Sequence, residues 1–140
     1  MRLNNSMCYL RKVLIVDDDN YNLALIGNML KNLGIAYDTA ADGTIAKEML
    51  IRNKYDLLLL DLQMPIVSGI DVASFLKKQH SKNTKIPIIL CTTLKLDDVY
   101  VHSLKNDLIE DYLFKPFDEM ILLESIQNVF DKKQLIYHEG

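Results

Sequence analysis

A run of four leucines, residues 57–60, lies between Asp56 and Asp61 and restricts the possible folds more than any other segment of the chain. The run has the length of a β-strand. No polar side chain alternates with the leucines, so a strand here is expected to be buried on both faces. Strands of this kind occur in parallel sheets that helices cover on both sides. The chain is therefore predicted to be an α/β protein with a carboxylate at each end of one buried strand.

Strand-length apolar runs alternate along the whole chain with segments whose apolar residues recur at helical spacing. The expected strands cover residues 12–17, 35–40, 56–61, 86–91 and 111–114. The expected helices cover residues 20–33, 45–52, 69–79, 97–105 and 120–130, the last after an N-cap at Asp118. This alternation predicts a doubly wound sheet of five parallel strands with five helices, in the flavodoxin-like strand order 2-1-3-4-5.

The length and composition of the chain predict a single soluble domain. Its 140 residues are 49% hydrophobic and 25% charged, which is ordinary for one globular core. We expect the domain to occupy residues 12–131. Residues 1–11 are expected to form an N-terminal arm or linker, and residues 132–140 a C-terminal tail.

The charge balance and the lengths of the apolar runs argue against several classes of protein. A net charge of −3 and a pI near 5.5 provide no general attraction to nucleic acid. The longest apolar runs are too short to span a bilayer, and the first residues do not resemble a signal peptide. Cys8 and Cys91 lack metal or redox spacing, so both are expected to be reduced. We expect a cytoplasmic protein that binds neither nucleic acid nor membrane.

Acidic residues follow two strands that should be neighbours in the sheet. Residues 17–19 are three consecutive aspartates after the first strand, and Asp61 closes the third. In the order 2-1-3-4-5, the switch point where ligands bind lies between the carboxyl ends of these two strands. A cluster of carboxylates suits Mg²⁺, or Mn²⁺ in its place, and has the wrong donors for structural zinc. The sequence therefore predicts a divalent cation site.

Two further polar residues are expected at the same edge of the sheet. Thr92 follows the fourth strand and Lys115 follows the fifth, so a hydroxyl and an ammonium should face the acidic residues. Nearby carboxylates would keep Lys115 protonated. Carboxylates that hold a metal, combined with donors that hold phosphate oxygens, indicate phosphoryl chemistry.

Three segments of the chain together resemble the receiver domain of two-component response regulators. VLIVDDDN at residues 13–20 is similar to the acidic segment of that family, LLLLDLQMP at residues 57–65 to its phosphoacceptor segment, and YLFKPF at residues 112–117 to its lysine-proline turn. The resemblance extends over residues 12–130. No single segment is specific, but the three occur in order and each at a predicted strand end.

The resemblance implies how the acidic residues are used. Asp61 would be the nucleophile that forms an acyl phosphate. Asp18 and Asp61 would ligate Mg²⁺ directly, Asp17 would hold a metal-bound water, and the backbone carbonyl of Gln63 would be a further ligand.

The resemblance also implies how a phosphoryl group is held and sensed. Thr92 and Lys115 would bind its oxygens, and the Lys115–Pro116 peptide bond would be cis. Tyr112 occupies the family's position for an aromatic ring that moves when Thr92 moves. The surface formed by the fourth helix, the fifth strand and the fifth helix would then change with phosphorylation.

The partners are also expectations from the resemblance. The phosphoryl donor would be a histidine kinase or a histidine phosphotransfer protein, and the switching surface could support a homodimer. The acidic opening and the DLQMP string resemble receivers attached to hybrid histidine kinases, although free-standing regulators carry similar strings.

Three alternatives from other classes stay open on the sequence. A phosphatase of the haloacid dehalogenase type would use Asp17 and Asp19 as its acidic pair, but it expects threonine where Tyr21 stands. A flavodoxin-like nucleotide binder would share the fold, yet three carboxylates in its first loop would repel phosphate. A receiver-shaped interaction module that is never phosphorylated would not need the set formed by Asp61, Thr92 and Lys115.

Overall fold

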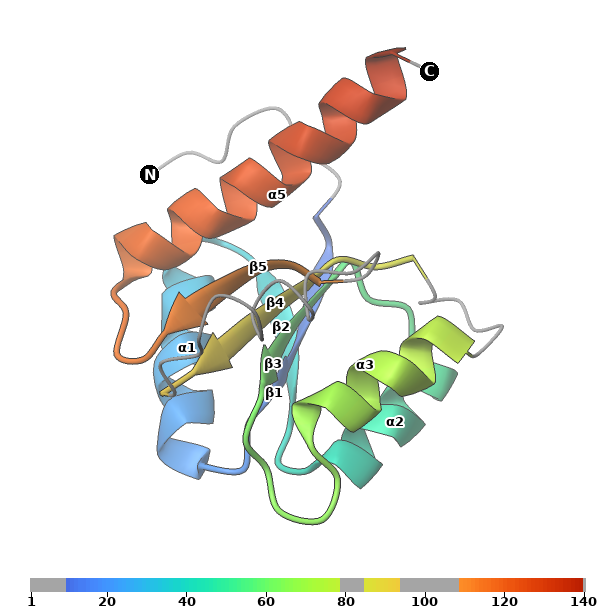
Figure 1. Cartoon of the computed structure of the whole chain (residues 1–140). Coiled ribbons are helices and arrows are strands. Elements are labelled where there is room, and N and C mark those ends of the chain that lie inside the picture. Colours follow the sequence, from blue (N-terminus) through green and yellow to red (C-terminus); the bar gives the residue numbers. More distant parts are fainter. Residues whose placement is uncertain (1–9, 79–84, 94–108, 140) are drawn as a thin grey trace.

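The computed structural model describes residues 10–78, 85–93 and 109–139 and has one five-stranded sheet with helices on both faces (Figure 1). All four strand pairs are parallel, and the strand order is β2-β1-β3-β4-β5. The strands are β1 (Lys12–Val16), β2 (Ala36–Ala40), β3 (Leu57–Asp61), β4 (Ile88–Thr92) and β5 (Ile109–Phe114). The predicted fold class and strand order are confirmed.

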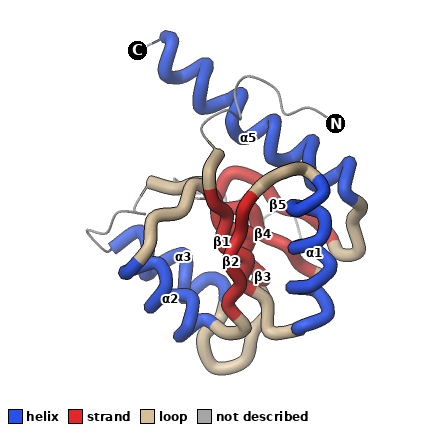
Figure 2. Tube along the Cα trace, turned by 180° about the vertical axis from the view of Figure 1, so that it is seen from behind, coloured by secondary structure: helices blue, strands red, loops and turns tan. Residues whose placement is uncertain are grey.

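The described helices are α1 (Asn20–Asn32), α2 (Gly43–Arg52), α3 (Gly69–Lys78) and α5 (Glu119–Glu139). The helix expected over residues 97–105 lies outside the described residues. Helices α1 and α5 cover one face of the sheet, and α2 and α3 cover the other (Figures 1 and 2). This arrangement makes three layers, as expected for alternating strands and helices.

Side-chain alternation along the strands divides the hydrophobic core into two clusters. In β3, Leu57 and Leu59 pack beneath α1 and α5, whereas Leu58 and Leu60 pack beneath α2 and α3. Every residue of β3 and β4 is buried, while β2 and β5 at the sheet edges are partly exposed. The leucine run is therefore apolar throughout because it lies between two helical layers.

Local caps fix where the helices begin and end. Asp19 accepts a hydrogen bond from the N–H of Tyr21 before α1, and Asp42 accepts one from Ile45 at the start of α2. These bonds satisfy N–H groups that lack partners in the first turn of a helix. Gly34 follows α1 with φ +76°, the left-handed conformation that glycine adopts at little cost. The chain can then turn directly into β2.

Helix α5 is longer than the sequence pattern indicates. The apolar spacing predicts a helix up to residue 130 followed by a tail, but the backbone stays helical to Glu139. Residues 131–139 contain no glycine or proline, so nothing in this segment stops a helix that is already formed.

Two further observations concern membrane-spanning segments and the cysteines. None of the helices in the described ranges is both long and apolar enough to cross a bilayer. Cys91 is a free, buried thiol in β4, and Cys8 lies outside the described residues.

Candidate functional site

Three aspartates meet at the carboxyl ends of β1 and β3. Asp17 and Asp18 follow β1 and Asp61 ends β3, and one carboxylate oxygen of each lies within 4.8 Å of the others. The strands bring them together because Val16 is the register partner of Leu60, so the residues that follow are also neighbours. Asp17 and Asp61 are buried, whereas Asp18 is exposed. The predicted acidic cluster therefore exists, and it opens to solvent on the Asp18 side.

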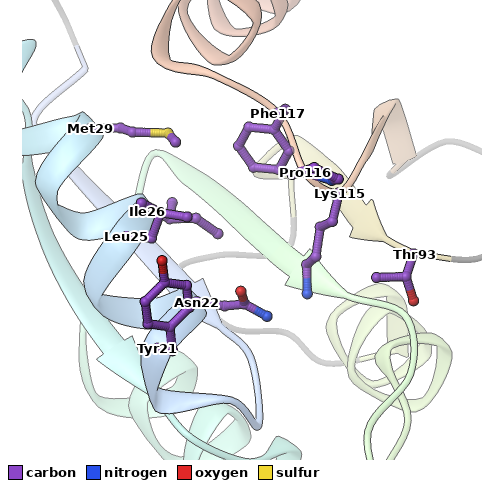
Figure 3. Close-up of a pocket in the computed structure, with 9 residues that line it drawn as sticks. All are labelled: Tyr21, Asn22, Leu25, Ile26, Met29, Thr93, Lys115, Pro116 and Phe117. Atoms are coloured by element: carbon purple, nitrogen blue, oxygen red, sulfur yellow. The ribbon is translucent and has the colours of Figure 1, made fainter.

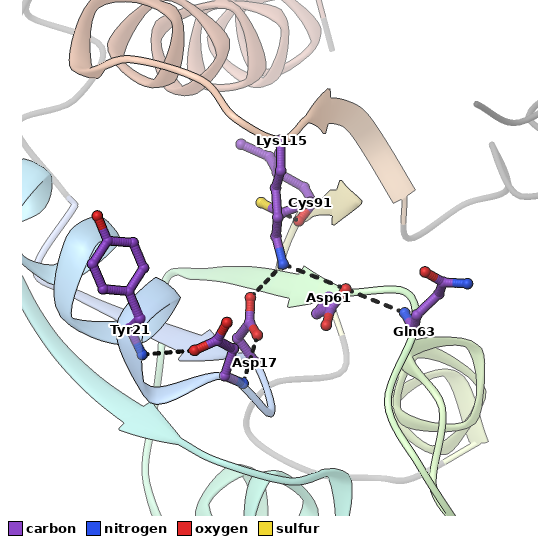
Figure 4. A network of polar contacts seen from close by, with 8 residues as sticks. Asp17, Tyr21, Asp61, Gln63, Cys91 and Lys115 are labelled. Carbon is purple, nitrogen blue, oxygen red and sulfur yellow. Dashed lines mark hydrogen bonds and ion pairs between the residues drawn. The ribbon is translucent and has the colours of Figure 1, made fainter. Parts of the chain in front are cut away.

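Lys115 follows β5 and reaches across the edge of the sheet to this cluster (Figure 4). Its ammonium donates a short hydrogen bond to Oδ2 of Asp17 and lies 3.6 Å from Oδ1 of Asp61. Its backbone N–H donates to the Thr92 carbonyl at 2.8 Å, which ties the end of β5 to the end of β4. The Lys115–Pro116 bond is cis, as the resemblance implies. One ammonium therefore forms ion pairs with two buried carboxylates.

Backbone donors orient the two buried carboxylates. The N–H of Asp19 donates to Oδ1 of Asp17 at 2.9 Å, and the N–H of Gln63 donates to Oδ1 of Asp61 at 3.2 Å. These bonds turn the loops that follow β1 and β3 back over the strand ends. The backbone of Gln63 is thus held beside Asp61, and the resemblance implies that its carbonyl is a metal ligand.

Gly69 is a site residue that is not among the predicted ones. It begins α3, and a Cβ at this position would collide with the Asp61 carbonyl and with the backbone of Leu62. Its N–H also donates to the Leu62 carbonyl at 3.1 Å. Glycine here lets the loop after β3 close tightly behind Asp61. A glycine a few residues beyond a strand-ending acid is the only sequence signal for this role.

The charges of the cluster are only partly compensated. Burial raises the pKa of Asp61 to about 6, and the charges of Asp17 and Asp18 add to this, while Lys115 acts against it. Burial alone would lower the pKa of Lys115, but its hydrogen bond to Asp17 and the charge of Asp61 outweigh burial and raise it. Lys115 therefore stays protonated, and the three carboxylates retain an excess of negative charge.

The donor set fits a hard divalent cation. The three carboxylates supply only oxygen, which is the ligand type that Mg²⁺ and Mn²⁺ prefer. Cys91 lies close by, but burial raises the pKa of its thiol to about 12, so it remains protonated. A protonated thiol is not a metal ligand. The residues present therefore suit magnesium and do not suit zinc.

Thr92 and Tyr112 lie on neighbouring strands near the acidic cluster. Thr92 is fully buried at the end of β4, one residue beyond Cys91, the register partner of Asp61. Tyr112 lies half-buried on β5 opposite Leu90 and packs against the cluster beneath α2 and α3. All the site residues predicted from the sequence therefore gather at the carboxyl edge of the sheet or on the strands that lead to it.

A pocket of about 320 Å³ lies beside Lys115 (Figure 3). Residues of α1 form one wall and the turn between β5 and α5 forms the other, with Thr93 at one end. The lining residues are Tyr21, Asn22, Leu25, Ile26, Met29, Thr93, Lys115, Pro116 and Phe117. The sequence does not predict this pocket, because its two walls are far apart in the chain and meet only in the fold.

The fold and this edge of the sheet define a class of signalling domain, and comparison with known proteins agrees. Residues 13–127 match the family model of the response regulator receiver domain. The chain belongs to this family, so the phosphatase and nucleotide-binder alternatives are set aside. Receiver domains are signalling phosphoacceptors rather than classical enzymes.

The chain spans nearly all of one curated relative and only a small part of another. The chain is 30% identical over 122 residues to the chemotaxis protein CheY of Pseudomonas aeruginosa, covering 86% of this chain and 97% of that protein. It is 32% identical over 119 residues to the aerobic respiration control sensor protein ArcB of Escherichia coli. That match covers 85% of this chain but only 15% of ArcB.

A solved structure extends the comparison to the site. The receiver domain of a sensor histidine kinase from Pseudomonas aeruginosa, solved with a magnesium ion in its active-site cleft, is similar with a TM-score of 0.73. It is 29% identical, and the match covers 86% of this chain and 98% of that one.

Proposed function

We propose that Asp61 accepts a phosphoryl group from the phosphohistidine of a histidine kinase or histidine phosphotransfer protein, with Mg²⁺ bound at the acidic cluster. One observation carries this proposal: the buried Asp61 carboxylate lies between two other carboxylates and the Lys115 ammonium, at an edge that opens to solvent. A nucleophile, a set of metal ligands and a fixed positive charge are thereby available within one small site.

The chemistry is a simple displacement. A carboxylate oxygen of Asp61 attacks phosphorus in line, the P–N bond to the donor imidazole breaks, and the imidazole leaves with its electron pair and takes up a proton. When bound, Mg²⁺ would neutralise charge on the phosphoryl oxygens. Positioning and charge stabilisation supply most of the catalysis in such transfers.

Each neighbouring residue has a proposed part. Asp18 and Asp61 would ligate the metal together with the Gln63 carbonyl, and Asp17 would hold a metal-bound water. Lys115 is bonded to Asp17 here. Because its ammonium is already 3.6 Å from Asp61, a small rotation of the side chain would bring it to a phosphoryl oxygen.

Thr92 and Tyr112 would sense the phosphoryl group and transmit its presence to the surface. Thr92 would donate its hydroxyl to the phosphoryl group, and Tyr112 would move in response. The surface around β5 and α5, with the fourth helix expected over residues 97–105, would then change shape and could pair with a second copy of the chain. Beside Lys115, the pocket between α1 and the turn after β5 would offer apolar walls for a side chain of the donor protein.

The proposal is tested by mass spectrometry after incubation with acetyl phosphate, with and without Mg²⁺. We expect one added phosphoryl group that depends on Mg²⁺ and maps to the peptide containing Asp61. Asp61→Asn should abolish the label, whereas Asp56→Asn, at the other end of the same strand, should keep it. Label on another residue, or none from any small phosphodonor, would contradict the proposal, and the second result would favour an interaction module.

A further inference from the structure

Phe114, the last residue of β5, contacts the aromatic ring proposed to move in the switch. The rings of Phe114 and Tyr112 meet edge to face, with centroids 5.5 Å apart and planes at 81°. Phe114 is also 45% exposed, although a phenylalanine this close to the core could have been buried. The ring of Phe114 is therefore only partly buried in the core, and it packs edge to face against Tyr112.

The strand register brings Phe114 next to the other switch residue as well. Phe114 is the register partner of Thr92, just as Tyr112 is the partner of Leu90. Because side chains alternate along each strand, these four residues share one face of the sheet. Phe114 thus lies opposite Thr92, whose hydroxyl would bind the phosphoryl group, and its ring contacts the ring that would respond.

We infer that Phe114 is a positioning residue that sets the equilibrium of the Tyr112 switch. The edge-to-face contact holds Tyr112 in the orientation seen when Lys115 is bonded to Asp17, which is the arrangement before a phosphoryl group attracts the ammonium. This inference rests on the proposed function, since it needs phosphorylation of Asp61 to be coupled to Tyr112.

The sign of the effect follows from linkage. The inference takes the two rings to separate when Tyr112 switches, so loss of the edge-to-face contact weakens only the arrangement before the switch. The switched arrangement then becomes easier to reach, and any group that favours it binds more tightly. An edge-to-face pair contributes enough to change such an equilibrium by about 2- to 10-fold.

Beryllium fluoride with Mg²⁺, a mimic of a phosphoryl group on a carboxylate, provides the test. The full chain is labelled with fluorotyrosine and titrated while the fluorine signal of Tyr112, assigned with Tyr112→Phe, is followed. Phe114→Leu should lower the half-saturating concentration of the probe by about 2- to 10-fold. Phe114→Tyr, which keeps the ring, should restore the wild-type value.

A double variant separates positioning from a structural role. In a Tyr112→Leu background, followed by protein thermal stability, Phe114→Leu should cause no further change in the half-saturating concentration. An unchanged or higher concentration in Phe114→Leu alone, or a change that persists without Tyr112, would overturn the inference while leaving the proposed function intact. If Phe114→Leu does not fold, Phe114→Met takes its place. A wild-type protein that fails to bind the probe would overturn both.

Discussion

Carboxylates at the two ends of the sheet have opposite surroundings. Asp38, in the middle of β2, accepts a hydrogen bond from the Tyr55 hydroxyl at 2.7 Å and pairs at 2.9 Å with Lys12, which lies at the amino end of β1. Asp56, just before the amino end of β3, accepts two backbone hydrogen bonds, from the N–H groups of Arg11 at 2.9 Å and Lys12 at 3.0 Å. Each of these acids has two donors, so both stabilise the fold.

At the carboxyl ends of the strands, three acids share one ammonium, which contacts two of them. Asp17, Asp18 and Asp61 lie together with Lys115, and the pKa of Asp61 rises to about 6 because the group is buried among like charges. The same residue type is thus well compensated at one end and poorly compensated at the other. The acids at the carboxyl ends therefore cost stability until a cation binds, which is typical of a functional site.

Replacing an acid should change the free energy of unfolding strongly and in opposite directions at the two ends of the sheet. Without Mg²⁺ at pH 7, Asp61→Asn should raise the free energy of unfolding by about 1 to 3 kcal/mol, because it removes a buried charge whose pKa is raised. Asp56→Ala should lower it by about 1 to 3 kcal/mol, because two backbone N–H groups lose their acceptor. Urea unfolding measures both, and a loss of stability in both variants would break the comparison.

The difference in stability between Asp61→Asn and the wild type should vary gradually with pH. The pKa of Asp61 is raised from 3.8 to about 6 in the fold, so its contribution to stability is fully present below pH 3.8 and is lost as pH rises through 6. The extra stability of Asp61→Asn over the wild type should therefore be absent at pH 3.8 and largest above pH 6. Metal-free unfolding at a series of pH values tests this, and a difference that is constant with pH would rule out the charge as its source.

The smallest expected effect concerns the loop that follows β3. Ile66 has φ 69°, and its side chain is fully exposed, so it has a strained backbone without packing in return. Asparagine tolerates this conformation better than a β-branched residue does. Ile66→Asn should raise the free energy of unfolding by about 0.5 to 1 kcal/mol. Ile51→Asn, at an exposed position in α2, is the control and should give no gain.

Much of the fold could be predicted because the signals are local. The leucine run between Asp56 and Asp61 indicates a strand buried on both faces, and the acids after the first and third strands meet because those strands are neighbours. Asp118 caps α5 as expected, its carboxylate accepting the N–H of Ile121. Where a residue type has a single physical reason to occupy a position, the sequence alone is sufficient to predict the local structure.

The features that were not predicted depend on contacts between distant segments. Gly69 matters only because the Asp61 carbonyl lies against it, and the pocket exists only where α1 meets the turn after β5. The left-handed Ile66 is the exception, because it lies in a tight local turn where the Val67 N–H bonds back to the Pro65 carbonyl. Isoleucine itself gives no sign of this conformation.

The carboxyl edge of the sheet lacks a positive charge, which a divalent cation would supply. A titration with MgCl₂ at constant ionic strength, followed by thermal unfolding, tests it most directly. The wild type and Asp38→Asn should show a saturable rise in unfolding temperature, whereas Asp18→Asn should show at least a tenfold weaker response. An equal rise in Asp18→Asn and the wild type, or no rise in the wild type, would contradict the account.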